Sequence, residues 1–251
     1  MPTPISIIIM SYNEEAIIED CLKAAVQASD DVVIVDSGST DNTLAIAKKY
    51  TDRIFYQKMD TYGTQKNYGA DQAKNDWVFA LDCDEILNDE LIQYLKTNDF
   101  KNGHIYRLAR KTNFGGQWVK YSDMWPDWIN RIYNRHENEF DDFLVHERLT
   151  GFDTMKKVKM PGYVYHYSYD NYQDLATKYD KYARLGAMNL IKENIKPSLI
   201  KVSLGPLFRF LKTYIFKLGF LDGKLGLTLS VEAARMVRKR YRYYYQFKKS
   251  K

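Results

Sequence analysis

The stretch Trp77-Val78-Phe79-Ala80-Leu81-Asp82-Cys83-Asp84-Glu85 decides the fold, because an apolar run there ends abruptly in three carboxylates within four positions. The run is too short for a buried helix and is rich in aromatic and branched residues, which favours a buried strand. The acidic residues then lie at the carboxyl end of that strand. In an open α/β sheet, ligands bind at this edge.

Closely spaced carboxylates repel one another, and a divalent cation held by their oxygens relieves the repulsion. Mg²⁺ and Mn²⁺ suit oxygen ligands and often keep coordination positions open for substrate phosphates. We therefore interpret Asp82 and Asp84 as candidate metal ligands. The alternative is an ordinary strand that meets a polar loop, with Asn88 or Asp89 capping the next helix.

Strand-like and helix-like segments alternate before the acidic stretch. Residues 5–10 form a β-branched run. The helical pattern that follows has its apolar positions at Ile17, Ile18, Leu22 and Val26. A second apolar run, a turn at Gly38 and a second helical pattern come next, and residues 53–56 add a short strand before a third helix. This alternation predicts an α/β fold with a mostly parallel sheet and right-handed crossovers.

Four polar motifs follow the predicted strands or open the predicted helices. They are Ser11-Tyr12-Asn13-Glu14, Asp36-Ser37-Gly38-Ser39-Thr40-Asp41, Gln65-Lys66-Asn67-Tyr68-Gly69 and Asp82-Cys83-Asp84-Glu85. In order and spacing they resemble the nucleotide-binding half of family-2 glycosyltransferases with the GT-A fold, over residues 1–100. The resemblance implies a nucleotide-diphospho-sugar donor, most often a UDP-sugar. Ser37 departs from the pattern of many relatives, which carry a second acid there, so base specificity stays open.

The resemblance also implies roles for single residues. Tyr12 and Asp36 would surround the base, and Asp82 would lie near the ribose. Asp84 would coordinate the Mg²⁺ or Mn²⁺ that bridges the diphosphate, and Lys66 would lie close to the nucleotide or its phosphates. The implied nucleotide-sugar site comprises Tyr12, Asn13, Glu14, Asp36, Lys66, Asp82 and Asp84. Taken singly, these positions also suit a turn residue at Asp36, a solvated helix charge at Lys66 and a core residue at Tyr12.

The segment after the acidic stretch is rich in tryptophan. Trp118, Trp125 and Trp128 lie in a stretch that glycines and Pro126 interrupt and that is too polar for a core element. Because aromatic faces stack on sugar rings, we assign these three residues to the acceptor site. A satellite hydrophobic cluster under a long loop is the alternative.

The second half of the chain also carries a His-Glu pair and a later histidine between tyrosines. These details resemble the lipopolysaccharide-core glucosyltransferase branch of the family. The resemblance implies Glu147 as the general base, with Asp127 as the alternative base. It implies His166 as the third metal ligand beside Asp82 and Asp84, with His146 as the alternative ligand or an acceptor contact. A histidine between tyrosines is also a common structural residue.

The chain of 251 residues is long enough for one large domain or for one domain and an appendage. Its N-terminus lacks the charged region and cleavage site of a signal peptide, so we expect a cytoplasmic protein. The two cysteines, Cys21 and Cys83, support neither a disulfide framework nor a zinc site. We expect both to be packing or incidental residues.

The net charge of +5 is unevenly distributed. From Lys201 onward, 13 Lys and Arg oppose Asp222 and Glu232, a balance of +11 that leaves −6 for the first 200 residues. Leu207, Leu211, Tyr214 and Leu218 have helical spacing, but basic residues interrupt them. The segment therefore suits the plane of a membrane interface better than a transmembrane helix.

The basic, tyrosine-rich stretch 235–245 would then lie against anionic headgroups. A packing or oligomerisation helix with a solvated basic face is the alternative.

The resemblance implies a GT-A domain over residues 1–198, with a nucleotide-sugar half (1–100) and an acceptor half (101–198), and the charge pattern predicts a basic amphipathic helical tail over 199–251. The function that the resemblance implies is metal-dependent, inverting transfer of a hexose, expected to be glucose, from a UDP-sugar to a hydroxyl of a lipopolysaccharide-core or lipid-linked saccharide. The enzyme would lie on the inner face of the cytoplasmic membrane, with no specific nucleic-acid partner. The alternatives are a non-catalytic nucleic-acid- or polyanion-binding α/β protein and a nucleotidyltransferase, although the latter usually opens with a Gly-rich phosphate loop.

Overall fold

The computed structural model describes residues 1–142 and 148–249. The described strands are β1 (Ile5–Ser11), β2 (Asp31–Asp36), β3 (Ile54–Tyr56), β4 (Trp77–Asp82), β5 (Glu85–Leu87), β6 (His104–Phe114), β7 (Gln117–Trp118), β8 (Asp127–Asn134) and β9 (Lys156–Tyr169). The described α-helices are α1 (Ile18–Ala28), α2 (Thr43–Ala47), α3 (Tyr62–Gln72), α4 (Asp89–Thr97), α5 (Tyr172–Lys192), α6 (Leu199–Leu211) and α7 (Gly223–Lys249). A π-helical turn, η1 (Lys212–Phe216), and a 3₁₀ turn, η2 (Gly219–Asp222), link α6 to α7.

The chain divides into two compact units. The sheet unit comprises Met1–Arg110 and Trp128–His166, and the helical unit comprises Lys111–Asp127 and Tyr167–Lys251. The predicted boundary between a domain ending at residue 198 and a tail beginning at residue 199 stays a prediction. It concerns which parts of the chain fold independently.

The sheet has the strand order β3-β2-β1-β4-β8-β6-β9-β5 in the part of the chain that is described, with β7 paired to β6. The prediction of an α/β fold is confirmed. The first four strands are parallel, as the strand-helix alternation predicts. The pairs β4–β8, β5–β9 and β6–β7 are antiparallel. The parallel part of the sheet thus ends at β4, which lies between β1 and β8. Strand β8 comes from much later in the chain, and no single crossover helix connects it to β4.

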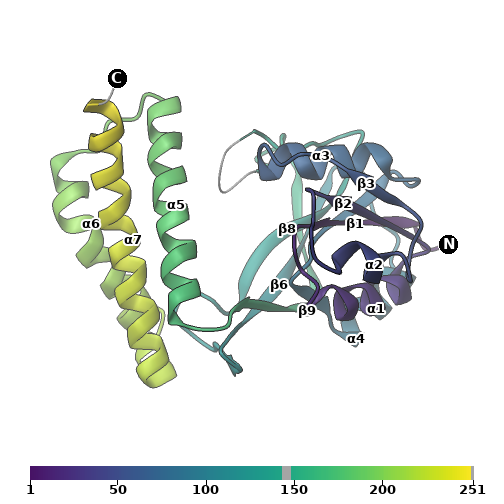
Figure 1. Ribbon diagram of the computed structural model, residues 1–251, viewed down its shortest axis with the longest axis horizontal. Coiled ribbons are helices and arrows are strands. Elements are labelled where there is room, and N and C mark those ends of the chain that lie inside the picture. Colours follow the sequence, from purple (N-terminus) through teal and green to yellow (C-terminus); the bar gives the residue numbers. More distant parts are fainter. Residues whose placement is uncertain (143–147, 250–251) are drawn as a thin grey trace. The chain divides into compact units, whose positions relative to one another are not determined.

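Helices cover both faces of the parallel strands, with α3 on one face and α1 and α4 on the other (Figure 1). Because successive side chains of a strand point to opposite faces, β1 contributes to two cores. Ile7 and Ile9 join Leu22 and Leu91 in one buried cluster, whereas Ile8 lies in the cluster under α3. Burial on both faces explains the three consecutive isoleucines at positions 7–9 of β1.

The buried face of α1 differs in part from the predicted one. Ile18 and Leu22 are buried as predicted, but Val26 is 38% exposed. Cys21 and Ala25 complete the buried face instead. The buried cluster around α1 also contains Cys83, which confirms both cysteines as packing residues. Burial raises the pKa of both thiols, which leaves them as unreactive thiols in the core.

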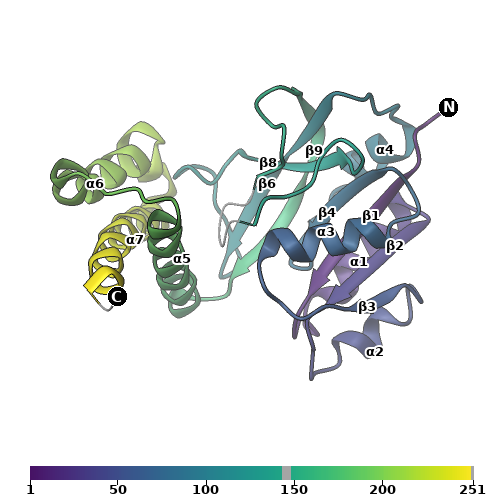
Figure 2. The same ribbon diagram turned by 90° about the horizontal axis from the view of Figure 1, so that it is seen from above.

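In the helical unit, α7 packs along α5 (Figure 2). Leu175 and Tyr179 of α5 share a buried cluster with Leu229 and Ala233 of α7 and with Val119 of the tryptophan-rich segment. Part of the tryptophan-rich segment thus lies in a separate hydrophobic cluster, which is the alternative to an acceptor site that its sequence left open.

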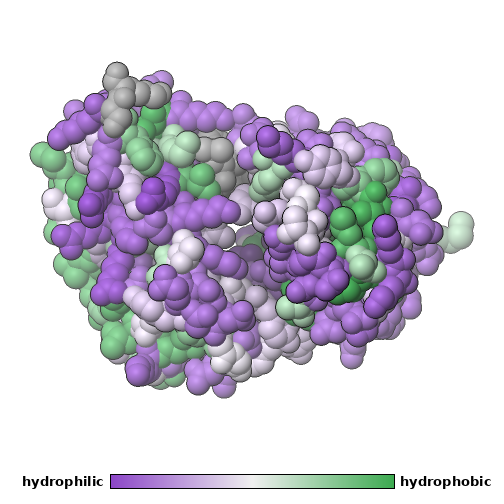
Figure 3. Space-filling view, viewed as in Figure 1, coloured by the Kyte–Doolittle hydropathy of each residue, from purple (hydrophilic) through white to green (hydrophobic). Residues whose placement is uncertain are grey.

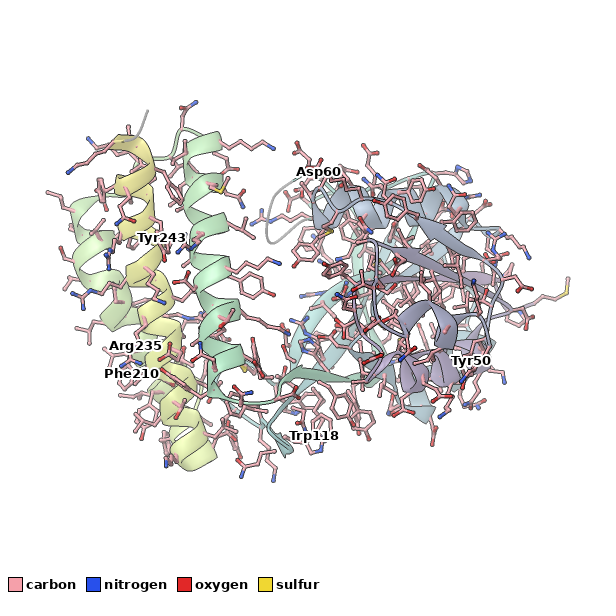
Figure 4. All side chains as sticks on the ribbon, in the orientation of Figure 1. Tyr50, Asp60, Trp118, Phe210, Arg235 and Tyr243 are labelled. Atoms are coloured by element: carbon pink, nitrogen blue, oxygen red, sulfur yellow. The ribbon has the colours of Figure 1, made fainter. Side chains whose placement is uncertain are left out.

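Polar contacts reinforce the packing of α7 on α5. Asp180 accepts hydrogen bonds from Lys239 Nζ (2.7 Å) and from the hydroxyl of Tyr243 (2.9 Å), which Figure 4 labels. Tyr172 donates to Glu232 Oε1 at 2.6 Å. The basic, tyrosine-rich end of the chain is therefore engaged in packing over much of its length.

Helix α6 has no buried residue, in contrast to α5 and α7. Its exposed apolar side chains recur at helical spacing and continue into η1. They are Ile200, Leu204, Leu207, Phe208, Ile215 and Phe216. In Figure 3, hydrophobic side chains gather at the left-hand edge of the view, where Figure 1 shows α6. We call this set the α6 face.

The α6 face differs from the predicted stripe. Leu207 and Leu218 are exposed, but Leu211 and Tyr214 are half-buried. The π-helical turn η1 and the left-handed conformation of Leu218 (φ 54°) change the helical register on which the prediction depended. Among the residues that the structure describes, no helix combines the length and the apolar character that a membrane crossing requires.

Candidate active site

Strand register brings the first polar motifs to one edge of the sheet. Ser11 is opposite Asp36, the last residue of β2, and Met10 is opposite Asp82, the last residue of β4. The three parallel strands therefore end together, and their carboxyl ends bring Asp36 and Asp82 to the edge at which α/β proteins bind ligands.

The Asp36 carboxylate shapes the loop that follows it. Its oxygens accept hydrogen bonds from Ser11 Oγ (3.0 Å), from the backbone N–H groups of Gly38 and Ser39 (both 2.8 Å) and from Ser39 Oγ (2.5 Å). Gly38 has a φ of 101°, which a side chain disfavours. Asp36 therefore stabilises the turn, which is the alternative role that its sequence suggested. A contact between Asp36 and the nucleotide base stays a prediction.

The loop after β1 is tied to the loop after β2. Asn13, with a φ of 54°, accepts a hydrogen bond from the Thr40 N–H at 2.8 Å, and the Glu14 N–H donates to Thr43 Oγ1 at 2.8 Å. Tyr12 is 59% exposed at this edge and is therefore not a core residue. These contacts give the two loops one defined arrangement beside an exposed aromatic ring.

Lys66 is buried near the acidic turn. Helix α3 begins with a capping box in which Thr61 accepts a hydrogen bond from the Thr64 N–H at 3.1 Å. Lys66 is 3% exposed, and its Nζ lies 4.9 Å from the centroid of the Phe140 ring. Its charge contributes to lowering the pKa of the Asp82 carboxyl. Lys66 is therefore not a solvated helix charge.

An ion network that the sequence did not reveal supports the acidic turn. Arg131 on β8 donates to both oxygens of Asp82, at 3.3 Å for Nη1–Oδ1, and to Glu85 Oε1 at 3.1 Å. Glu85 is completely buried, lies 3.5 Å from Arg110 Nη1 and accepts the Asp82 N–H at 3.2 Å. Burial alone would raise the pKa of Asp82, but Arg131 and Lys66 lower it well below its usual value. The Asp82 carboxylate is therefore ionised and held in place.

Asp84, the next acid of the turn, lies beside His166. Residue 166 of β9 is opposite Glu85 of β5, and this pairing places His166 Nε2 3.3 Å from Asp84 Oδ2. Within the described part of the chain, His166 Nδ1 is buried without a hydrogen-bond partner. The structure thus brings together two of the three predicted metal ligands, which are 82 positions apart in the sequence.

The donor atoms near Asp84 fit a shared cation site. No group of three or more His, Cys, Asp or Glu gathers into a metal site within residues 1–142 and 148–249. A carboxylate and an imidazole fit Mg²⁺ or Mn²⁺ whose remaining positions are filled by a diphosphate and water, which is how Mg²⁺ is often bound beside phosphates.

The three predicted acceptor tryptophans fall into two groups. Trp118 and Trp125 lie in the helical unit, where Lys111 Nζ is 5.6 Å and 5.8 Å from their ring centroids. Tyr167 packs edge-on against Trp118 at 5.5 Å. Trp128 lies in the sheet unit under Lys159 Nζ at 4.6 Å. The helical unit therefore contains an aromatic cluster around one lysine.

The remaining predicted residues are the two candidate bases and the alternative ligand His146. Glu147 and His146 lie outside the described residues. Asp127 is half-buried and begins β8. The choice between Glu147 and Asp127 as base therefore stays a prediction.

A sheet with helices on both faces and an acidic turn at the ends of its parallel strands is typical of nucleotide-binding α/β proteins. Residues 6–159 match the family described as Glycosyl transferase family 2. The chain belongs to this family and is a glycosyltransferase with the GT-A fold. Family membership favours an enzyme over the polyanion-binding protein and the nucleotidyltransferase that the sequence left open.

Two relatives align with nearly the whole chain. This chain is 27% identical over 238 residues to the lipopolysaccharide core biosynthesis glycosyltransferase LpsC of Rhizobium meliloti (strain 1021). The alignment covers 92% of this chain and 86% of LpsC. This chain is also 27% identical over 239 residues to the uncharacterized glycosyltransferase RP128 of Rickettsia prowazekii (strain Madrid E), covering 90% and 82%.

Among solved structures, glucosyl-3-phosphoglycerate synthase of Mycobacterium tuberculosis, crystallised with Mn²⁺, UDP and glucosyl-3-phosphoglycerate, has a similar fold. The TM-score is 0.51 at 18% identity, over 78% of this chain and 82% of that chain.

Proposed function

We propose that the protein transfers a hexose, with inversion, from a UDP-sugar to a hydroxyl of a lipopolysaccharide-core or lipid-linked saccharide. The approach of His166 Nε2 to Asp84 at the ends of the parallel strands carries this proposal. The similarity to LpsC supports the acceptor class, and the UDP bound to the structural neighbour supports the donor class. Glucose is the proposed sugar.

The donor would lie along the edge formed by the ends of β1, β2 and β4. Tyr12 would stack on the base, and Lys66 and the loops around Asn13 and Asp36 would line the nucleotide site. Asp84 and His166 would hold Mg²⁺ or Mn²⁺, which supplies positive charge next to the diphosphate. These residues would orient the anomeric carbon toward the acceptor. Correct orientation of two reactants lowers the activation free energy of transfer substantially.

Transfer is a single displacement. The acceptor oxygen forms a bond to the anomeric carbon while the bond from that carbon to the diphosphate oxygen breaks, and the nucleoside diphosphate leaves with the electron pair. Glu147, or Asp127 in its place, would take the proton of the acceptor hydroxyl. One displacement inverts the anomeric configuration.

The acceptor would contact the cluster of Trp118, Trp125 and Lys111. Exposed parts of the two indole rings suit stacking on a sugar ring, and the lysine suits an anionic substituent on the saccharide. Trp128 and His146 stay predicted acceptor contacts.

A donor screen tests the proposed reaction. UDP-glucose, UDP-galactose, UDP-GlcNAc and GDP-mannose are each incubated with the protein, with Mn²⁺, Mg²⁺ or EDTA, and free nucleoside diphosphate is measured. We expect metal-dependent hydrolysis of UDP-glucose above that of the others. Equal rates for all four donors, or no effect of EDTA, would contradict the proposed donor or the proposed metal.

We also propose that the α6 face attaches the enzyme to the cytoplasmic side of an anionic membrane. Exposed side chains on this face include Ile200 at 72%, Phe208 at 63% and Phe216 at 72%. A contiguous exposed apolar surface of this kind marks an interaction site. An amphipathic helix of this type lies in the plane of a bilayer interface.

Charge favours an anionic bilayer over another apolar partner. The segment 199–224 contains Lys201, Arg209, Lys212, Lys217 and Lys224 against Asp222, a balance of 5 − 1 = +4. Each basic residue near an anionic surface contributes about 1 kcal/mol, which adds to the insertion of the apolar side chains. Helix α7 contributes less than the sequence predicts, since Lys239 and Tyr243 contact Asp180.

Liposome flotation tests the membrane proposal with Leu207→Glu/Phe208→Glu. A truncation before Lys201 would remove α7 together with α6 and would expose Leu175 and Tyr179 of α5, which α7 covers. It therefore does not test the α6 face by itself. We expect the wild type to float with phosphatidylglycerol vesicles but not with phosphatidylcholine vesicles, and high salt to weaken flotation. The double variant should bind at least about tenfold more weakly, because it replaces two inserting apolar side chains by charges.

The matched control for flotation is Val26→Glu, a similar change at an exposed apolar residue of α1. It should float like the wild type. Flotation of the double variant at the wild-type level would exclude the α6 face as the attachment site. A concentration-dependent dimer that the double variant loses would instead indicate a second copy of the chain on this face.

A further inference from the structure

A groove of about 710 Å³ lies between α5 and α7, within the helical unit. Ligand sites in proteins commonly have volumes of about 300–1,000 Å³. In the order of α5, its lining begins at Gln173 and Thr177, continues at Asp180 and Arg184 beside Lys239 of α7, and reaches Met188. We call this hollow the α5–α7 groove.

The charged side chains of the groove leave a surplus of positive charge. Lys181, Arg184 and Lys239 line it against a single carboxylate, that of Asp180. This carboxylate accepts hydrogen bonds from Arg184 Nε at 2.9 Å, Lys239 Nζ at 2.7 Å and the Tyr243 hydroxyl at 2.9 Å. The hydrogen bonds from Arg184 and Lys239 lower the pKa of Asp180 well below its usual value, so Asp180 is ionised. The groove therefore has two more positive than negative charges.

Asp180 orders two of these cations without burying them. The side chain of Arg184 is 55% exposed, and that of Lys239 is 44% exposed. The Arg184 guanidinium also lies over the ring of Tyr243, which Figure 4 labels, with Cζ 4.5 Å from the ring centroid. Because the two cations are already ordered, an anionic ligand would lose little affinity to their immobilisation. A guanidinium and an ammonium group are the side chains that bind phosphate.

Packing alone does not account for this gathering of charge. An exposed ion pair adds at most about 1 kcal/mol to stability. The contact between α5 and α7 depends instead on a buried apolar cluster that includes Leu175 and Leu229. The surplus of basic side chains in the groove therefore points to a ligand.

The groove begins near the proposed acceptor cluster. Gln173 lies in the first turn of α5, six positions after Tyr167, whose ring packs against Trp118. Six residues span at most about 21 Å, so one saccharide can contact both Trp118 and this end of the groove. From Gln173 to Met188 the groove follows α5 for about 22 Å. A groove of this length accommodates several sugar units.

We propose that the α5–α7 groove binds the phosphorylated part of the saccharide acceptor, with Arg184 and Lys239 contacting its phosphate groups. This inference rests on the proposed function, and it narrows the acceptor to saccharides that carry phosphate. The sugar that receives the hexose would lie at the cluster of Trp118, Trp125 and Lys111, and the charged part of the same molecule would lie along α5.

Binding without donor tests the inference. The probe is core oligosaccharide released from lipopolysaccharide by mild acid, used before and after removal of its phosphate groups with hydrofluoric acid, and its affinity is measured by calorimetry. We expect the wild type to bind the phosphorylated form at least about tenfold more tightly. Arg184→Gln should weaken binding of that form by at least about fivefold and leave binding of the dephosphorylated form within about twofold of the wild type.

Thr177→Glu gives a second test that leaves the contacts of Asp180 intact. Thr177 is an exposed lining residue, and a carboxylate there should repel the phosphorylated probe and weaken its binding by a similar factor. Arg235→Gln is the matched control. Arg235 is 59% exposed and pairs with Glu232 of its own helix outside the groove, much as Arg184 pairs with Asp180. This variant should bind both forms like the wild type.

Equal affinity of the wild type for the two forms would overturn the inference, and so would binding of neither form or equal weakening in the Arg184 and Arg235 variants. UDP affinity and flotation with phosphatidylglycerol vesicles should both stay unchanged in Arg184→Gln. Loss of either, with oligosaccharide binding retained, would overturn the inference and assign the charge to the donor or to a membrane.

Failure of the proposed function gives a different result. A wild type that binds the phosphorylated oligosaccharide through Arg184 but releases no nucleoside diphosphate from any donor would contradict the proposed transfer and leave the binding site standing. Metal-dependent donor hydrolysis by a protein that binds neither oligosaccharide would do the reverse.

Discussion

Asp84→Asn is expected to abolish sugar transfer, with a loss of at least about 10³-fold in kcat/KM. The substitution removes a carboxylate oxygen that would hold the cation next to the leaving diphosphate, and metal stabilisation of such charge is worth several kcal/mol. The substitution hardly changes the side-chain volume, and it leaves Asp82, Glu85 and Arg131 unaltered, so the fold should be retained. Steady-state rates with UDP-glucose and a thermal melt measure the two effects.

Asp89→Asn is the matched control for this loss. Asp89 lies in the exposed first turn of α4, five positions away, and has no role in the proposed site. It should have wild-type activity. EDTA should abolish wild-type activity, and added Mn²⁺ should restore it. Activity that survives both EDTA and the Asp84 substitution would show that transfer needs no cation at this site.

Glu147→Gln is expected to lower kcat by at least about 10²-fold while donor affinity changes little. The carboxylate would act only as the acceptor hydroxyl loses its proton, and a general base contributes typically 10²–10⁴-fold. Hydrolysis of the donor by water should fall less than transfer does, because the substitution leaves the donor site intact. Transfer rates and UDP binding are measured side by side.

Asp127→Asn decides between the two candidate bases. An inactive Asp127 variant beside an active Glu147 variant would reverse the assignment. Glu139→Gln is the control for a neutralised exposed glutamate in the same region, and it should leave turnover unchanged.

The sequence by itself determined the parallel half of the sheet and the position of the acidic turn. Strand and helix periods are local properties, and the run Trp77–Leu81 has too few residues and too much apolar character for any other element. It also determined that Asp36, Asp82 and Asp84 follow strands, since the ends of parallel strands must meet at one edge.

Only the tertiary structure decided which charges meet there. Arg131 is 49 positions from Asp82, and nothing local to β8 indicates that its side chain reaches the acidic turn. Lys66 resembles a solvated helix residue until α3 packs against Phe140. Ion pairs and burial depend on side chains that the chain brings together from a distance, and no local period encodes them.

The tail illustrates the same division. Its composition predicts a basic amphipathic element, but two helices share that composition and only packing separates their roles. Leu229 and Ala233 of α7 are buried against α5, whereas α6 has no buried residue. A helical pattern identifies an apolar face but not what covers it, because the covering surface comes from another part of the fold.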